Sequence, residues 1–293
     1  MRIQFTIICL IFSSVMIGQK IRYDSTLLEA FTNQIEIEHD ITVSDYFNFM
    51  DALVKIGDSV LNYPFSEHIL VRNNPWIVDA FADTDYYRMM AKDSFVFDQK
   101  KLVILHKGEV LKVPDSITTC NILRDFERTR IEINIPEFRL RIFKDTVLLN
   151  SFLVRVGKNR KRFLAMGNRE TDLRTKRGKG IIVKHVRDPD FYNPVNGKQF
   201  YYTKRDDGKT TFMPQIPWIE TEINGVRNGQ MIHPTTNPVT LGQPYSNGCI
   251  GTKEADAWII YYNAPIGTPI EIKYQLKDLE GNELEDIYEL SLR

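Results

Sequence analysis

The strongest constraint on the fold is a series of short apolar segments with a two-residue period that begins near residue 130. Ile131, Ile133 and Ile135 alternate with polar residues, and the same period returns over 138–143 and 152–156. Short strands at this spacing favour a β-sandwich or barrel over a parallel α/β sheet, in which helices would separate the strands. The segment 130–275 is therefore expected to be a mainly-β domain.

One helix and two further β elements complete the predicted second half. Thr252 is suited to cap a helix whose apolar stripe includes Trp258 and Tyr262, and Pro265 ends it. A last strand is expected over 269–274. The acidic tail, 276–293, is predicted to form a hairpin. The fold class is therefore α+β.

The segment 19–129 predicts a small N-terminal α+β module. Apolar residues at helical spacing over 43–54 indicate a helix, and 101–105 and 110–113 predict two strands joined as a hairpin at Gly108. Residues 116–129 are expected to link the module to the β domain. The hairpin resembles the end of a LysM repeat, which makes the module a candidate for cell-wall binding.

The first 18 residues have the pattern of a secretory signal peptide. Arg2 precedes an apolar run from Phe5 to Ile17, and the small residue Gly18 follows as the cleavage position. The run is shorter than the ~20 residues that a membrane-spanning helix needs. The mature protein is therefore expected to be exported, to the periplasm or the cell surface, without a stable membrane span.

Charge excludes one class of partner and draws attention to one segment. The chain has 38 Lys+Arg and 38 Asp+Glu, so no overall positive field exists to hold a nucleic acid. The segment 158–179, by contrast, has nine basic and two acidic residues. We interpret this basic segment either as a solvated loop or as a rim that attracts a carboxylate-rich substrate.

Cys249 and His233 are the candidate catalytic residues. Gly248 permits a tight turn before Cys249, and a helix expected about three residues later would favour the thiolate. A cysteine with a histidine base is a common route to an acyl-enzyme. By residue type alone, a buried structural thiol and a structural imidazole stay open, as they do for Cys120.

The segments around these residues resemble the L,D-transpeptidase family, with its YkuD-type catalytic domain. His233 and Ser246-Asn247-Gly248-Cys249 match the spacing of the family signature, and "HPTTNP", "RIEINIPEFRLRIFKD" and "IGTPIEIKY" match further segments in order. The resemblance covers about Arg130 to Tyr274. It implies a cysteine acyltransferase that acts on peptidoglycan stem peptides.

The resemblance also implies the roles of single residues. Cys249 would attack the carbonyl after the third residue of a stem tetrapeptide and expel D-alanine, with His233 as the general base. Amides near Gly248 and Cys249, supported by Ser246, would bind the oxyanion. An amine of a second stem peptide would then form the cross-link. No metal or cofactor is required, and carbapenem-type inhibitors are expected to acylate the cysteine.

Four positions depart from the family pattern. Asn247 replaces a second histidine and cannot exchange a proton, so His233 is predicted to be the only base. Pro234 replaces glycine but keeps a carbonyl that could orient the imidazole. Gly251 stands where an arginine suited to a substrate carboxylate is common; Lys253 or the basic segment is expected to compensate. The Thr175–Gly178 turn lacks its usual proline.

Weaker candidates and alternatives stay open. Tyr245 and Trp218 either line a substrate groove or serve as packing aromatics. The activity could instead be that of a carboxypeptidase or a protein-anchoring transferase, or the protein could be a non-catalytic cell-wall-binding protein. A zinc site built from Cys249, His233 and His185 is the remaining alternative, although these residues include no close ligand pair.

Overall fold

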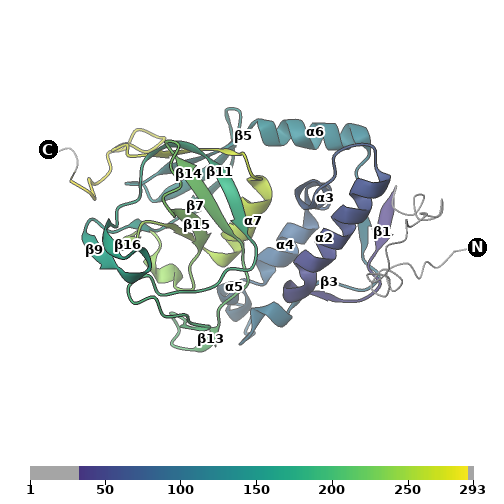
Figure 1. The fold of residues 1–293 in the computed structure, drawn as a ribbon, viewed down its shortest axis with the longest axis horizontal. Coiled ribbons are helices and arrows are strands. Elements are labelled where there is room, and N and C mark those ends of the chain that lie inside the picture. The colour runs from purple at the N-terminus through teal and green to yellow at the C-terminus, as the bar shows by residue number, and fades with distance from the viewer. Residues whose placement is uncertain (1–32, 290–293) are drawn as a thin grey trace, which may run out of the picture.

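The computed structural model describes residues 33–289, which form a helical N-terminal module at one end and a mainly-β domain at the other (Figure 1). The predicted signal peptide lies outside the described residues, as do the last four residues of the tail. Among the helices of residues 33–289, none combines the length and the hydrophobicity that a membrane crossing requires.

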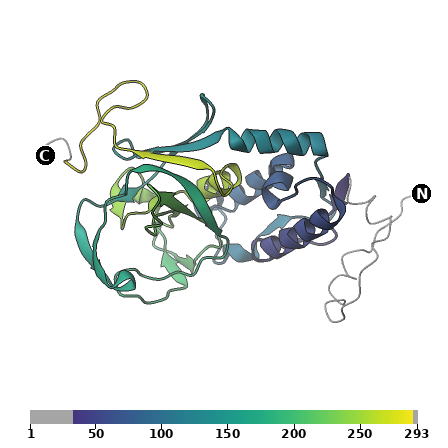
Figure 2. The same cartoon turned by 45° about the horizontal axis from the view of Figure 1, so that its top comes forward.

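Helices dominate the N-terminal module. Its helices are α2 (Val43–Val60), α3 (Glu67–Asn73), α4 (Trp76–Asp83), α5 (Tyr86–Met90), the 3-10 helix η1 (Gln99–Lys101) and α6 (Ser116–Glu127). The predicted helix over 43–54 is confirmed and continues to Val60. The segment expected to be a linker is instead α6, because the Asp115 carboxylate accepts a hydrogen bond from the Thr118 amide and caps it. This helix leads directly into the β domain (Figure 2).

The hairpin predicted around Gly108 is wrong, although the turn and both strands exist. Strand β3 (Val103–Leu105) pairs with β2 (Ile41–Thr42), and β4 (Val110–Lys112) pairs with β1 (Gln34–Glu36). The reason is that the chain around Ile37 lies at the turn, where its backbone bonds to both Gly108 and Glu109. Each strand therefore has a partner earlier in the chain.

An eight-stranded sheet forms the β domain, and the predicted α+β class is confirmed. In spatial order its strands are β17 (Ile250–Thr252), β15 (Met231–Pro234), β14 (Trp218–Ile223), β11 (Gly178–Val186), β18 (Pro269–Lys273), β5 (Thr129–Asn134), β6 (Arg139–Lys144) and β7 (Val147–Leu153). The pairs β15–β17 and β18–β5 are parallel, and the others are antiparallel. Ile131 and Ile133 are fully buried, as their two-residue period predicts.

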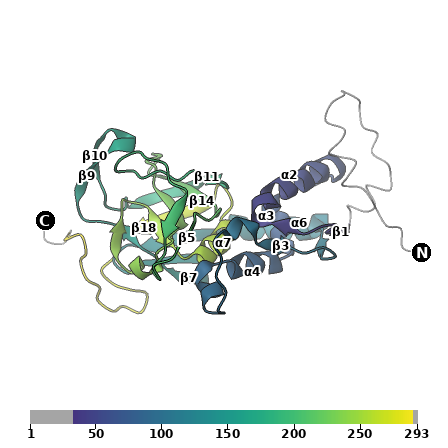
Figure 3. The ribbon, with the colours of Figure 1, turned by 90° about the horizontal axis from the view of Figure 1, so that it is seen from below.

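Three smaller strand pairs surround this sheet. They are β8 (Val156–Gly157) with β16 (Pro244–Ser246), β9 (Lys161–Leu164) with β10 (Arg169–Asp172), and β12 (Tyr202–Lys204) with β13 (Thr210–Phe212). The 3-10 helices η2 (Ala165–Gly167) and η3 (Pro238–Thr240) lie in the same region. The β9–β10 hairpin of the basic segment is exposed and lies at the end of the molecule remote from the module (Figure 3).

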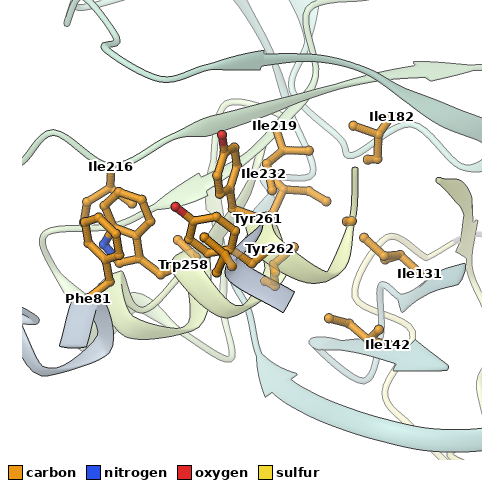
Figure 4. Close-up of a cluster of buried hydrophobic side chains, with 14 of the residues drawn as sticks. Phe81, Ile131, Ile142, Ile182, Ile216, Ile219, Ile232, Trp258, Tyr261 and Tyr262 are labelled. Atoms are coloured by element: carbon orange, nitrogen blue, oxygen red, sulfur yellow. The ribbon is translucent and has the colours of Figure 1, made fainter. Parts of the chain in front are cut away.

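Helix α7 (Glu254–Asn263) joins the two parts into one core. It packs on α4, where the rings of Phe81 and Trp258 stack with centroids 3.8 Å apart (Figure 4). Its predicted stripe, which includes Trp258 and Tyr262, is buried. Thr252 does not cap the helix, because it belongs to β17 and Lys253 holds the N-cap position. The module is therefore packed against the β domain rather than tethered to it.

The tail after β18 forms an isolated bridge between Lys277 and Glu283, rather than the strands of a full hairpin, over its described part. Tyr288 then returns to the domain and is buried. Its hydroxyl donates to the Gly157 carbonyl oxygen at 2.7 Å and accepts from the Thr175 amide at 3.1 Å. The tail therefore ties β8 to the Thr175–Gly178 turn.

Candidate active site

The parallel strands β15 and β17 bring the predicted nucleophile and base together. His233 pairs directly with Gly251, and Cys249 stands two residues before Gly251, just ahead of β17. Side chains two residues apart along a strand point to the same face, and directly paired residues share a face. Cys249 and His233 therefore lie on one face of neighbouring strands, although sixteen residues separate them in sequence.

The backbone fixes the orientation of His233. Its Nδ1 lies 2.8 Å from the carbonyl oxygen of Pro234, and Trp218 stacks on the ring with centroids 4.7 Å apart. A carbonyl oxygen only accepts, so Nδ1 carries the proton and Nε2 presents its lone pair. Burial, and then the positive charge of Arg155, lower the pKa of His233 to about 4. The imidazole is thus a neutral base at physiological pH.

The environment of Cys249 differs from the expected helix N-terminus. Strand β17 lies between Cys249 and α7, so the dipole argument for this thiol is wrong. Burial raises the pKa of the Cys249 thiol, while a hydrogen bond from the Met231 amide and the charge of Arg155 act in the opposite direction. The positive charge near the sulfur therefore comes from a side chain.

A hydrogen-bonded turn holds the residues before Cys249. Ser246 Oγ donates to the Cys249 carbonyl oxygen at 2.5 Å and accepts from the Gly248 amide at 3.1 Å. Gly248 has a φ of +117°, which a side chain would strain. Because its amide is engaged by Ser246, the Cys249 amide is the better candidate for an oxyanion donor. Asn247 is half-buried in the same turn.

Thr175 is a supporting residue that the sequence reasoning did not place in the site. Its hydroxyl donates to the Gly248 carbonyl oxygen at 3.1 Å and accepts from the Gly157 amide at 2.8 Å. It thereby ties the turn before Cys249 to β8. The Thr175–Gly178 turn, noted only as a departure from the family pattern, was the signal that could have identified it.

Arg155 is the second residue that sequence reasoning missed. It pairs with Gly251 on the side of β17 opposite His233, through two backbone hydrogen bonds of 2.9 and 3.0 Å. A Cβ atom on Gly251 would lie 2.5 Å from Arg155 Nε and 2.7 Å from its Cγ. Glycine at position 251 therefore makes room for the Arg155 side chain, and its occurrence in place of a common arginine was the available signal.

The remaining candidates lie at or outside the edge of this site. Tyr245 is 49% exposed and lies beneath Lys158 Nζ, which is 4.3 Å from the ring centroid, so the basic segment borders the turn before Cys249. Lys253 is exposed at the start of α7. It is Arg155, rather than Lys253 or the basic segment, that occupies the space left by Gly251.

The predicted zinc alternative is not supported by the geometry. His185 Nε2 lies 3.0 Å from the Ala264 carbonyl oxygen, and its ring stacks on His68 at the α7 interface. Within residues 33–289, no three His, Cys, Asp or Glu side chains are grouped so that they could hold a metal ion. Cys120 is exposed on α6, and both it and Cys249 are free thiols.

A mainly-β domain with a neutral histidine on one parallel strand and a cysteine just before its neighbour defines a cysteine–histidine class of site. Residues 128–272 match the family model of the L,D-transpeptidase catalytic domain, YkuD. This domain belongs to the L,D-transpeptidase family.

Sequence identity to individual relatives is low. The chain is 25% identical over 186 residues to the probable L,D-transpeptidase ErfK/SrfK of Escherichia coli, and the match covers 61% of this chain and 55% of that protein. An L,D-transpeptidase structure from Xylanimonas cellulosilytica has 14% identity, a TM-score of 0.37, and 72% and 97% coverage. L,D-transpeptidase 3 of Mycobacterium tuberculosis with a faropenem-derived adduct has 14% identity, a TM-score of 0.33, and 50% and 60% coverage.

Proposed function

We propose that the protein is an exported cysteine L,D-transpeptidase that cross-links peptidoglycan stem peptides. The observation that carries this proposal is the arrangement of Cys249 and His233 on one face, with the imidazole tautomer set by the Pro234 carbonyl. This arrangement supports proton transfer from the thiol to Nε2. Membership of residues 128–272 in the family supports a stem peptide as the substrate.

The reaction begins with a neutral thiol and a neutral imidazole, because burial raises one pKa and lowers the other. As Cys249 Sγ attacks the carbonyl after the third residue of the stem tetrapeptide, its proton passes to His233 Nε2. The Cys249 amide stabilises the oxyanion. The C–N bond to D-alanine then breaks, and the departing nitrogen takes the proton from His233. A thioester on Cys249 and free D-alanine result.

The second half of the reaction reverses these roles. An amine of another stem peptide attacks the thioester and loses a proton to His233 Nε2, and the thiol leaves with that proton restored. The new amide is the cross-link. If water or a protein amine served as acceptor, the same site would be a carboxypeptidase or an anchoring transferase. Product analysis with a defined tetrapeptide donor, with and without an acceptor stem peptide, separates these three outcomes.

Acylation by a carbapenem tests the nucleophile directly. We expect intact-protein mass spectrometry of residues 19–293 to show one adduct per chain in the wild-type protein and none in Cys249→Ala. Cys120→Ala is the matched control, because it removes the other free thiol, which is exposed on α6, and it should acylate normally. Folded, reduced wild-type protein without an adduct would contradict the proposal and favour a non-catalytic cell-wall-binding protein.

A further inference from the structure

Arg155 is a half-buried cation that no carboxylate pairs with in the described part of the chain. Its Nη1 donates to Thr240 Oγ1 at 3.1 Å, but its buried Nε–H has no hydrogen-bond acceptor, and no carboxylate in residues 33–289 forms an ion pair with it. Buried donors are nearly always satisfied, so an unsatisfied one next to a candidate nucleophile requires an explanation. An arginine offers several donors in a planar fork that suits a carboxylate.

The position of Arg155 relative to the reacting groups follows from the strand register. Gly251 pairs with His233 of β15 on one side and with Arg155 on the other, through an isolated bridge, so the three residues form one row. Cys249 precedes that row on the same face. Neighbouring strands are ~4.8 Å apart, so the backbones of Arg155 and His233 are ~10 Å apart. Between them lies the space that a side chain at position 251 would fill, which we call the Gly251 gap. The charge of Arg155 influences the pKa of both His233 and Cys249, which agrees with this placement.

Thr240, at the end of the 3-10 helix η3, holds the guanidinium of Arg155. The Thr240 hydroxyl donates its own proton to the Asn237 carbonyl oxygen at 2.7 Å, so its lone pairs face Arg155 Nη1. One edge of the fork is therefore anchored, while Nε has no partner. The structure thus presents a cation fixed in direction, which a bound anion would satisfy at small entropic cost.

We propose that Arg155 binds the C-terminal carboxylate of the donor stem peptide, the group that leaves with D-alanine, and so selects donors that end in a free acid. This inference rests on the proposed function. The carboxylate belongs to the residue directly after the attacked carbonyl, so it must lie close to Cys249 during the reaction. Neither Lys253 nor the basic segment fills the Gly251 gap, whereas Arg155 does.

The test compares two tetrapeptide donors that differ only at the C-terminus, a free acid and its amide, by the release of D-alanine or D-alaninamide. A charge-assisted hydrogen bond in a buried site gives the wild-type protein an expected preference for the acid of about 10- to 100-fold in kcat/KM. In Arg155→Gln this preference should fall to within about threefold of unity. Both donors meet the same thiol and imidazole, so changes in nucleophile strength cancel in the ratio.

Arg124→Gln is the matched control, because it removes an exposed arginine from α6 and should keep the wild-type preference. An Arg155→Gln protein that still prefers the acid, or a wild-type protein that releases both products equally, overturns this inference alone. A folded wild-type protein that releases neither product overturns the proposed function as well.

A double variant that moves the arginine from position 155 to position 251 provides a second test. The three side-chain atoms nearest the Cβ position of residue 251 are Cγ, Cδ and Nε of Arg155, so Arg155→Ala clears the space for an arginine at 251. The double variant Arg155→Ala with Gly251→Arg should regain part of the preference for the acid that Arg155→Ala loses. A folded double variant without any preference would contradict the assignment of selectivity to a guanidinium over β17.

Discussion

Two arginines of this protein, the buried Arg205 and the half-buried Arg155, have opposite surroundings. Arg205 lies at the interface between the module and α7, where its side chain is 0% exposed. It pairs with Glu254 at 2.5 Å and donates to Thr211 and Gln99, both at 2.8 Å. Its guanidinium also lies over the Tyr86 ring. Arg155, in the candidate active site, makes one side-chain hydrogen bond and leaves Nε–H without an acceptor.

The contrast distinguishes an arginine whose charge is satisfied within the fold, Arg205, from one whose charge is available to a ligand, Arg155. A buried ion is tolerated in a fold when its charge and its donors are satisfied, as those of Arg205 are. Its partners come from η1, α5, β13 and α7, so the network joins the module to the β domain. Arg155 has no comparable set of partners, and the missing partner is a negatively charged acceptor.

The largest expected effect comes from breaking the Arg205 network. Arg205→Met leaves the Glu254 carboxylate buried without its counter-charge, and the free energy of unfolding should fall by about 3–5 kcal/mol. Arg155→Met leaves no buried carboxylate behind and should change it by no more than ~1 kcal/mol. Urea denaturation of the two variants, followed by tryptophan fluorescence, measures both values.

A double variant identifies the cause of the first effect. Arg205→Met with Glu254→Met removes both charges and should recover most of the lost stability, because the penalty arises from the unpaired carboxylate. Equal destabilisation by Arg205→Met and Arg155→Met would remove the distinction between the two arginines.

The pH dependence of acylation reports the pKa of His233, which the charge of Arg155 helps to lower. Only neutral His233 can accept the thiol proton, and its pKa lies near 4, so the acylation rate should be nearly constant from pH 7 to 5 and fall below about pH 4. A base with an ordinary pKa of 6.5 would already have lost about tenfold at pH 5.5. The measurement is the rate of carbapenem acylation across this range.

Arg155 should control the pH at which the acylation rate begins to fall, the acidic limb of the profile. Its charge lowers the pKa of His233, so Arg155→Gln should move the limb to higher pH. Desolvation lowers the pKa of His68 to about 3 and that of His185 to about 4. The unfolded chain protonates both near 6.5, so the free energy of unfolding declines as the pH falls from about 6.5 towards 3, and circular dichroism must accompany each point. If the acylation rate instead fell near pH 6.5, and fell at the same pH in Arg155→Gln, the result would indicate a thiolate–imidazolium pair.

Local sequence patterns predicted part of the structure correctly. The alternation of Ile131 and Ile133 predicted buried strands. The resemblance singled out Cys249 and His233, which the strand register brings to one face of the candidate site. The hairpin at Gly108 failed because its strands take partners from residues 34–42, and no local pattern reports such pairing. The helix argument for Cys249 failed because three residues of strand intervene.

Arg155 was missed for a related reason. It lies 96 positions before Gly251, and only the strand bridge between them brings the side chain to the site. A glycine in place of an arginine signals a changed pocket, but sequence spacing cannot show which residue enters the space. The expectation that Lys253 would compensate relied on proximity along the chain, whereas strand pairing determines proximity in space.

The smallest predicted effect is that of Tyr87→Phe. This variant tests whether the N-terminal module influences the candidate active site as well as the stability of the fold. The Tyr87 hydroxyl donates to the Thr236 carbonyl oxygen at 2.9 Å, in the loop after His233, and accepts from the Asp206 amide at 2.9 Å. Tyr87→Phe removes both bonds at a half-buried position, which water can partly replace. The free energy of unfolding should fall by ~1 kcal/mol, with less than about a threefold change in acylation rate. A tenfold loss of rate at unchanged stability would show that the module positions the His233 loop, and the division between a structural interface and a catalytic site would no longer hold.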